Sequence, residues 1–436
     1  MDAANIFFKA HDLKKKLLFT LVILFVCRVG SYITIPGINS FALSSLAAAN
    51  SKGILGMFNV FSGGSLSRMS IFALSIVPYI TSSIVMSLLT VAVKPLEDLK
   101  KEGEVGRRKI NQYTRYLTVI LCAFQAYGLA RGLENMRGAG ENIVIISSGL
   151  FRVTTVITLV VGTMFLMWLG EQISMRGIGN GTSLIIFTGI ISGLPATFAS
   201  ILELTKTGVM GPFTLIFIFL VVVALIYFIV FMERAQRKIP VQYPKRQMGN
   251  KLFEGQSTHL PLKINTAGVI PAIFANSILL FPLTITNFMS GNEGEGGFWN
   301  TVLIYLGRGK PLYLILYVLF IVFFAFFYTS IVFNAQETAT MLKKNGGFIP
   351  GIRPGEYTAK YLDKILARLT VIGAAYLSFV CVLPEYVSSK YAIPFYLGGT
   401  SFLIVVSVVL ETLSQVQSSL FSYQYESLMK KARFRR

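Results

Sequence analysis

Clusters of arginine and lysine are the side chains best placed in this chain to bind a ligand. They lie in two long polar gaps, at residues 233–266 and 334–368, among Pro, Gly and Tyr. Positive charge gathered in exposed loops attracts anionic surfaces, of which lipid headgroups and RNA phosphates are both candidates. The alternative is that these charges only orient the chain in a membrane. The residues concerned are Arg234, Arg237, Lys238, Lys245, Arg246 and Arg353.

No other group of side chains has the pattern of a catalytic or metal centre. The three cysteines, Cys27, Cys122 and Cys381, lie in separate apolar runs, and the two histidines, His11 and His259, are far apart. These spacings match neither a zinc site nor a disulfide framework. We therefore predict no cofactor and no enzymatic activity.

Two glycine patterns need an interpretation. The run RGIGNG at 176–181 has the letters of a phosphate-binding loop, but it follows an apolar helix and lacks a Walker lysine and a Rossmann context. We interpret it as a tight cytoplasmic turn. The GxxxG pattern of Gly189 and Gly193 predicts a close approach between helices.

Long apolar runs must position all of these residues. The chain is 53% hydrophobic and only 14% charged, whereas soluble domains carry about 25% charge. The runs have the length of about 17–25 residues that a helix needs to cross a hydrocarbon core. Helix is also the open-chain structure that pairs every backbone group there. We predict an all-α polytopic membrane protein with ten spans, at 17–38, 72–93, 117–133, 153–169, 184–201, 213–232, 267–288, 312–333, 369–387 and 393–410.

The basic residues give this arrangement an inside and an outside. Of the 40 Lys and Arg, 30 fall at the two ends of the chain or in every second gap between spans. Because cytoplasmic loops carry the excess of basic residues, we predict that both termini are cytoplasmic. An even number of spans, such as ten, satisfies this orientation.

The gap between the first two spans is unusual. Residues 53–68 are too short to span a membrane but too apolar for a solvated loop, and Gly63 and Gly64 interrupt them. A re-entrant half-helix enclosed by protein fits this composition. An amphipathic stretch lying on the membrane surface fits it equally well.

Polar side chains are scarce within the spans, and Arg28 is the clearest charge among them. Ion-coupled transporters need buried acids or histidine relays, so this scarcity argues against that class. Ser82, Ser83, Gln125 and Asn276 are milder polar residues that can hydrogen-bond between helices, at about 0.6 kcal/mol each. From the pattern alone, each is best interpreted as structural.

Several long motifs resemble the bacterial SecY family. They occur in the family's order, and the resemblance extends over residues 12–431. The motifs are MFNVFSGG at 57–64, KEGEVGRRK at 101–109, GEQ at 170–172, RGIGNG at 176–181, STHLPLK at 257–263, GVIPAI at 268–273, PGIRPG at 350–355 and QYE at 424–426.

The resemblance implies a specific architecture. The ten helices would form two inverted five-helix halves around a central pore, residues 1–205 and 206–436, with a hinge between the fifth and sixth spans. The unusual gap would be a plug helix, at about 54–70, that closes the pore from the outer side. Its expected residues are Met57, Phe58, Val60, Phe61, Gly63 and Gly64.

The resemblance also implies roles for residues in the spans. A pore ring of isoleucines would surround the moving chain without binding it, since branched aliphatic side chains make no directional hydrogen bonds. A lateral gate between spans two and three and spans seven and eight would contain the polar residues Ser82, Ser83, Gln125 and Asn276. The ring residues are Ile76, Ile80, Ile186, Ile273 and Ile404.

The function implied is that of a protein-conducting channel of the general secretory pathway in the bacterial plasma membrane. Preproteins would cross it, and membrane segments would leave it sideways. The partners implied are SecE, SecG, the SecA motor and the ribosome, with anionic lipids around the channel, and Arg353 would matter for SecA-driven work. The alternatives from other classes are a small-solute secondary transporter and an insertase or scaffold without a pore.

Overall fold

The computed structural model describes residues 11–39, 43, 62–135, 137–138, 141–142, 144–207, 211–243, 246–248, 251–253, 257–289, 310–391 and 398–433. Each of the ten predicted spans overlaps one helix in this part of the chain. These helices are α2 (His11–Gly30), α5 (Val77–Ala92), α7 (Glu104–Asn135), α8 (Ser148–Arg176), α9 (Gly181–Lys206), α10 (Pro212–Arg234), α11 (Ile270–Met289), α13 (Pro311–Val332), α15 (Glu356–Tyr391) and α16 (Gly399–Arg433). The all-α polytopic fold is therefore confirmed.

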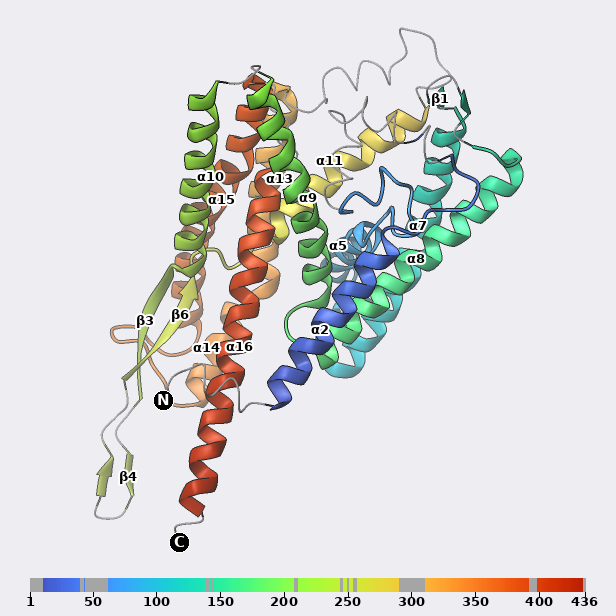
Figure 1. Cartoon of the computed structure of the whole chain (residues 1–436). Coiled ribbons are helices and arrows are strands. Elements are labelled where there is room, and N and C mark those ends of the chain that lie inside the picture. Colours follow the sequence, from blue (N-terminus) through green and yellow to red (C-terminus); the bar gives the residue numbers. More distant parts are fainter. Residues whose placement is uncertain are drawn as a thin grey trace.

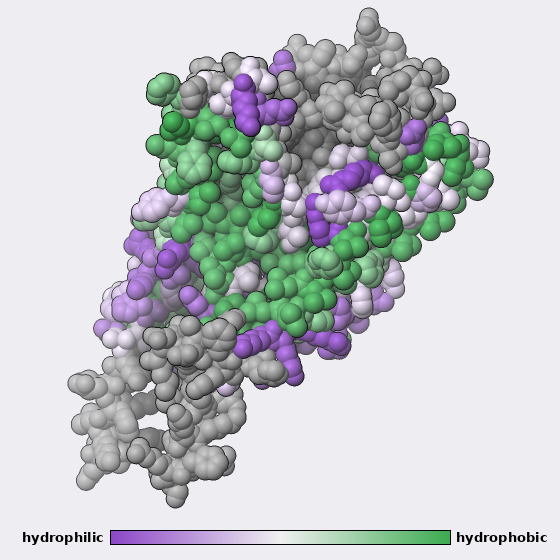
Figure 2. All heavy atoms as spheres, viewed as in Figure 1, coloured by the Kyte–Doolittle hydropathy of each residue, from purple (hydrophilic) through white to green (hydrophobic). Residues whose placement is uncertain are grey.

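Within the described ranges, seven helices are long and apolar enough to cross a membrane by length and composition. An eighth span is possible because α5 and the short α6 (Lys94–Lys101) pass the same test together, although they are bent by 98°. Figure 2 shows hydrophobic side chains over a broad band of one face, with hydrophilic side chains along its lower margin and in smaller patches at the upper end and right of the middle. This distribution is the one expected of a chain whose middle faces lipid.

Several helices differ from the predicted bounds. α7 has 32 residues, α15 has 36 and α16 has 35, all longer than a bilayer requires. The polar ends of these helices extend into water. A hydropathy pattern detects only the apolar part of a helix, so it does not predict where such a helix ends. α5 begins at Val77 rather than at residue 72, with Pro78 in its first turn, a position where the missing proline N–H has no cost.

The helices pack in two groups that follow the chain order (Figure 1). α2, α5, α7, α8 and α9 contact one another, as do α10, α11, α13, α15 and α16. Three sets of contacts join the groups: α11 packs against α5 and α7, α16 against α9 and α2, and α10 against α9. The division into halves at residues 205 and 206 stays a prediction, and this packing is compatible with it.

The first long basic gap forms a β-ribbon rather than an irregular loop. β3 (Gln236–Gln242) pairs antiparallel with β6 (Ser257–Lys263), with Ile239 opposite Leu260. A second short pair, β4 (Arg246–Met248) and β5 (Lys251–Phe253), lies further along the same gap. The ribbon, the start of α2 and the end of α16 all lie at the same end of the molecule (Figure 1).

Residues 62–76, called the 62–76 segment below, run between helices without being helical themselves. Residues 62–69 form turns, and residues 53–61 of the unusual gap lie outside the described residues, so the choice between a half-helix and a surface stretch stays open. The backbone of the 62–76 segment pairs with the chain that follows α2, where Ile35 N–H donates to Met69 O and Ile71 N–H donates to Ile33 O, both at 2.9 Å. Gly162 of α8 faces the segment, and a Cβ there would overlap the Ile71 carbonyl oxygen.

We predict that Gly162→Ala destabilises the protein. The added methyl group must displace the backbone of Ile71, and overpacking of this kind costs about 1–3 kcal/mol. Gly149→Ala in the same helix is the matched control, because a Cβ there meets no described atom within 4 Å. Its free energy of unfolding should be unchanged or raised by at most about 1 kcal/mol. Unfolding titrations in mixed micelles measure both, and equal values would contradict the close approach.

Candidate functional site

An apolar cluster at the centre of the molecule contains all five predicted pore-ring isoleucines. Ile76, Ile186 and Ile404 are buried members of the cluster, and Ile80 and Ile273 pack against it partly buried. Ile76 is the last residue of the 62–76 segment, and the others come from α5, α9, α11 and α16, so both groups of helices contribute. The cluster holds many further residues, and the ring role of these five stays a prediction.

The 62–76 segment adjoins this cluster and contains the described part of the predicted plug. Gly63 and Gly64 lie in it with φ of 64° and 84°, which are left-handed values that glycine adopts without strain. Phe72 belongs to the central cluster. The other predicted plug residues, Met57, Phe58, Val60 and Phe61, lie outside the described residues.

Arg28, the charge that stands out in the first predicted span, contacts the 62–76 segment. Its guanidinium Nη1 donates to the Gly63 carbonyl oxygen at 2.8 Å and to Ser31 Oγ at 3.3 Å. Its Nη2 donates to the Tyr32 hydroxyl at 3.2 Å. A charge within a span must face a polar interior, and this one lines a cavity of about 40 Å³ together with Ser62, Ser65, Ser75 and Thr188.

The sequence did not reveal what Arg28 binds, because its partner is a backbone carbonyl. The predicted role of Gly189 also changes. A Cβ on Gly63 would lie 2.8 Å from Ser192 Oγ and 3.0 Å from Gly189 Cα, so the 62–76 segment approaches α9 closely at Gly189. A Cβ at Gly193 meets no described atom within 4 Å.

The predicted gate helices do meet across the two groups. α11 contacts both α5 and α7, and α13 packs behind α11. Ser82 is fully buried, and its hydroxyl donates a hydrogen bond of 2.8 Å to the Pro78 carbonyl oxygen of its own helix. The Ser83 carbonyl oxygen accepts a hydrogen bond of 2.8 Å from Ser87 Oγ. Asn276 is buried, and its Oδ1 has no hydrogen-bond partner among the described residues. Gln125 forms no hydrogen bond with Ser82, Ser83 or Asn276 among the described residues. These four residues therefore form no hydrogen-bonded network there.

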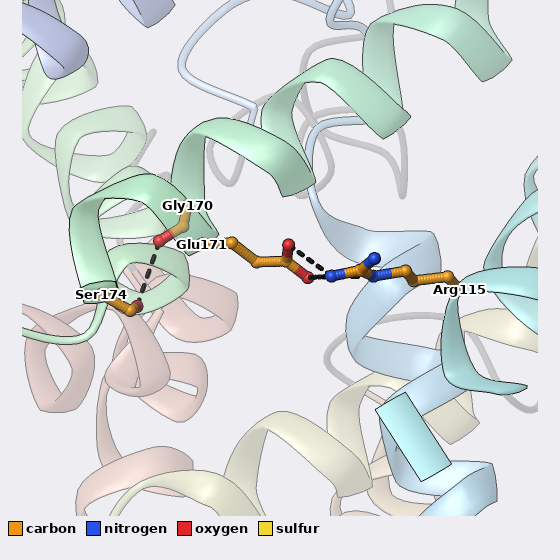
Figure 3. Close-up of polar contacts among 4 residues, drawn as sticks. All are labelled: Arg115, Gly170, Glu171 and Ser174. Atoms are coloured by element: carbon orange, nitrogen blue, oxygen red, sulfur yellow. Dashed lines mark hydrogen bonds and ion pairs between the residues drawn. The ribbon is translucent and has the colours of Figure 1, made fainter. Parts of the chain in front are cut away.

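Two ion pairs fasten the gate helix α7 to α8, one near each end. Arg115 binds the Glu171 carboxylate in a forked geometry, with Nη2 at 2.6 Å and 2.8 Å from its two oxygens (Figure 3). One turn further along α8, Ser174 Oγ donates to the Gly170 carbonyl at 3.1 Å. At the other end, Arg152 Nη2 lies 2.6 Å from Glu134 Oε2. α7 and α8 are thus held as one unit.

The glycine-rich turn between α8 and α9 has its backbone amides occupied. Ile178 N–H donates to Thr20 Oγ1 of α2 at 3.2 Å, and Gly179 N–H donates to Gln415 Oε1 of α16 at 2.7 Å. Gly181 N–H donates to Ser174 Oγ at 2.9 Å. A phosphate loop needs such amides free to receive the ligand. The turn instead joins α2, α8 and α16.

The two basic gaps meet in one structural unit. Gln242 and Phe348 exchange two backbone hydrogen bonds of 2.9 Å, which joins β3 to the chain before Arg353. Beneath them, Ile239 and Leu262 pack in a separate cluster with Ile349 and Leu362.

The basic side chains of this unit face outward. Arg234, Arg237, Lys238 and Arg353 are exposed, and none of them forms an ion pair with another described residue. Elsewhere on the surface, a hydrogen bond from Lys101 to Glu97 lowers the pKa of that carboxyl. Lys245 lies outside the described residues, and only the backbone of Arg246 is described, in β4. The exposed set therefore remains available to an anionic partner.

These features define a class of protein: a multi-pass helical membrane protein whose two groups of helices meet at an apolar centre. Comparisons with known proteins identify the family. The SecY family model matches residues 70–413. The chain is 60% identical to "Protein translocase subunit SecY" of Rickettsia conorii over 425 residues, which is 98% of each chain. This chain belongs to the SecY family.

Two solved structures share the fold. One, described as "The structure of a protein conducting channel", has a TM-score of 0.66 at 19% identity and covers 94% of this chain and 93% of its own. The other, "Sec61 in the Canine ribosome-channel complex from the endoplasmic reticulum", has a TM-score of 0.63 at 18% identity, with the same coverage.

We predict that the two ion pairs of α7 and α8 differ in strength. The Glu134 side chain is 10% exposed and the Glu171 side chain 28%. Glu134→Gln should lower the free energy of unfolding more than Glu171→Gln does, because the Glu134 carboxylate is the less exposed of the two. Glu171→Gln should cost at most about 1 kcal/mol, since water screens that pair. The same micelle titration measures both, and a larger loss for Glu171→Gln would refute this ranking.

Proposed function

We infer that this chain is the protein-conducting channel subunit of a bacterial secretory translocase. It passes unfolded preproteins across the plasma membrane and releases apolar segments sideways into the lipid. Both termini and the basic unit face the cytoplasm. The chain itself catalyses no reaction, and the energy comes from its partners. A small-solute transporter is the weaker alternative, since the apolar centre has no charged coupling site in the described residues.

The observation that carries this proposal is the apolar cluster to which both groups of helices contribute. A closed ring of Ile76, Ile80, Ile186, Ile273 and Ile404 would exclude water by dewetting, and so keep ions from passing. When the two groups separate, the same side chains would surround an extended polypeptide. They offer no hydrogen bonds, so the channel accepts chains of any sequence.

Gating would occur where α11 meets α5 and α7. These contacts are the ones that must part for a signal sequence to reach lipid, and the pairing of α7 with α8 means that both helices move together. Asn276 is the residue of α11 best suited to tune this step, because a buried amide oxygen without a partner weakens the closed contact.

The partners that we propose are the SecE and SecG subunits, the SecA motor, the ribosome and anionic lipid. The exposed cations of the basic unit support the ribosome and SecA assignments, since RNA phosphate and acidic protein surfaces both bind arginine. The dog Sec61 channel of the same fold is described in a ribosome complex. Reconstitution with SecE and SecG in vesicles, followed by SecA- and ATP-dependent import of a preprotein, tests the proposal directly. Uptake of a small solute in place of the preprotein would favour the transporter.

We predict that Arg353→Glu abolishes SecA-dependent import while leaving insertion into the membrane intact. The side chain is exposed, and the backbone carbonyl of Arg353 is held by Thr358 Oγ1 at 2.9 Å, so the local fold should survive the substitution. Lys206→Glu, the same charge reversal at the exposed far end of α9, is the control and should import at the wild-type rate. Wild-type import by Arg353→Glu would remove this residue from the docking surface.

We predict that Asn276→Leu makes the gate more stringent. Leucine removes the unsatisfied amide and packs against α5 and α7, which stabilises the closed contact. Preproteins with weakly hydrophobic signal sequences should then import several-fold more slowly relative to those with strong ones. The ratio of the two import rates is the measurement. A ratio equal to that of the wild type would rule out a gating role for Asn276.

A further inference from the structure

The 62–76 segment lies between three helices and packs closely against a glycine of each. A Cβ on Gly30 of α2 or on Gly162 of α8 would collide with the segment, and a Cβ on Gly63 of the segment would collide with α9. The pairs in contact are Gly30 with the Phe72 ring, Gly162 with the Ile71 carbonyl, and Gly189 with Gly63. The segment therefore fits its place closely without the regular hydrogen bonds of a helix.

The conformation of the segment in this place is strained. Met69 and Ser75 have φ of 42° and 52°, in the left-handed region that side chains other than glycine rarely adopt. Ser65 Oγ and Ser70 Oγ are buried without a hydrogen-bond partner among the described residues. Each of these features is unfavourable on its own and persists only where surrounding contacts impose it. The segment would relax if those contacts were removed.

Arg28 supplies the strongest polar contact that opposes this relaxation. Its hydrogen bond to the Gly63 carbonyl is short, at 2.8 Å, and carries a full charge. The bond joins α2 to the segment across 35 residues of chain. Arg28 is itself held by the Tyr32 hydroxyl, and its guanidinium carbon lies 4.9 Å from the Tyr32 ring centre.

We propose that Arg28 is a latch that holds the strained 62–76 segment closed, with Gly189 as the notch that receives Gly63. The contact between Arg28 and the segment does not depend on the proposed function. The consequence, that release of the segment opens the pore, rests on the proposed function. The group that Arg28 holds is a backbone carbonyl, and every residue of a polypeptide carries one. An entering chain of any sequence can therefore replace Gly63 on the guanidinium, which releases the segment without selecting the cargo.

Cys27 is a built-in reporter of this release. It is 7% exposed, and it lines the same cavity as Arg28 and Ser65. In a protein with Cys122→Ala and Cys381→Ala, we would measure the rate at which a water-soluble maleimide labels Cys27, in vesicles without partner or substrate. Arg28→Gln should raise this rate at least about tenfold, which corresponds to about 1.4 kcal/mol.

Arg68→Gln is the matched control for the lost charge. Its guanidinium carbon lies 4.2 Å from the same Tyr32 ring, but its loss leaves the bond between Arg28 and Gly63 in place. Because Arg68 also contacts Tyr32, labelling of Cys27 in this variant should rise only slightly, and much less than in Arg28→Gln. Equal rates for Arg28→Gln and Arg68→Gln would overturn the proposal.

A second pair of variants distinguishes release of the 62–76 segment from the simple loss of the Arg28 side-chain volume next to Cys27. Gly189→Ala adds a methyl group beside the cavity, so faster labelling of Cys27 in this variant must come from displacement of the segment. Gly193→Ala, one turn along α9, should label at the wild-type rate. Unchanged labelling in Gly189→Ala would refute the notch. Import of a preprotein is measured separately on the same variants. Faster labelling of Cys27 together with no import in the wild type or any variant would count against the channel function and not against the role of Arg28.

Discussion

The structure depends on one constraint: within the membrane, each backbone N–H and C=O must find a partner inside the protein. The long helices of the described residues meet it through their own backbone hydrogen bonds. The 62–76 segment meets it differently, by pairing Met69 and Ile71 with the chain after α2 and by giving the Gly63 carbonyl to Arg28. A non-helical segment can therefore lie at the centre of the molecule only while α2, α8 and α9 enclose it. The same enclosure brings its strained residues beside the apolar centre.

Two non-helical stretches are held by bonds between their backbone and a side chain of a helix. Gly179 N–H binds Gln415, and the Gly63 carbonyl binds Arg28, so each contact joins a side chain from one helix to the backbone of a turn. Such a hydrogen bond requires a defined geometry, but it does not require a particular residue at the backbone position, because almost every residue has the same amide group. That property suits a protein whose cargo varies in sequence.

The amino-acid sequence was sufficient to predict the order of the long helices in the described residues. Apolar runs and the distribution of basic residues report directly on burial in lipid, so each predicted span falls on a helix. The ends of α7, α15 and α16 were beyond this reasoning, since a helix that continues into water loses its apolar signal. For the gap that contains the start of the 62–76 segment, the sequence left an enclosed half-helix and a surface stretch equally open, since the turns and the partner of Arg28 depend on tertiary contacts of backbone atoms. No residue pattern encodes these contacts. The roles of the ring and gate residues came from family resemblance and stay predictions.

The last helix has a mechanical consequence. α16 runs unbroken from Gly399 to Arg433, with Ile404 near one end in the apolar centre and Gln415 at the glycine-rich turn. At 1.5 Å per residue, about 16 Å separate Ile404 from Gln415 and about 27 Å separate Gln415 from the far end. A stiff rod pinned at Gln415 is a lever with a long outer arm. A push of a few ångströms on its outer end swings Ile404 by somewhat over half that distance, in the opposite direction and with greater force.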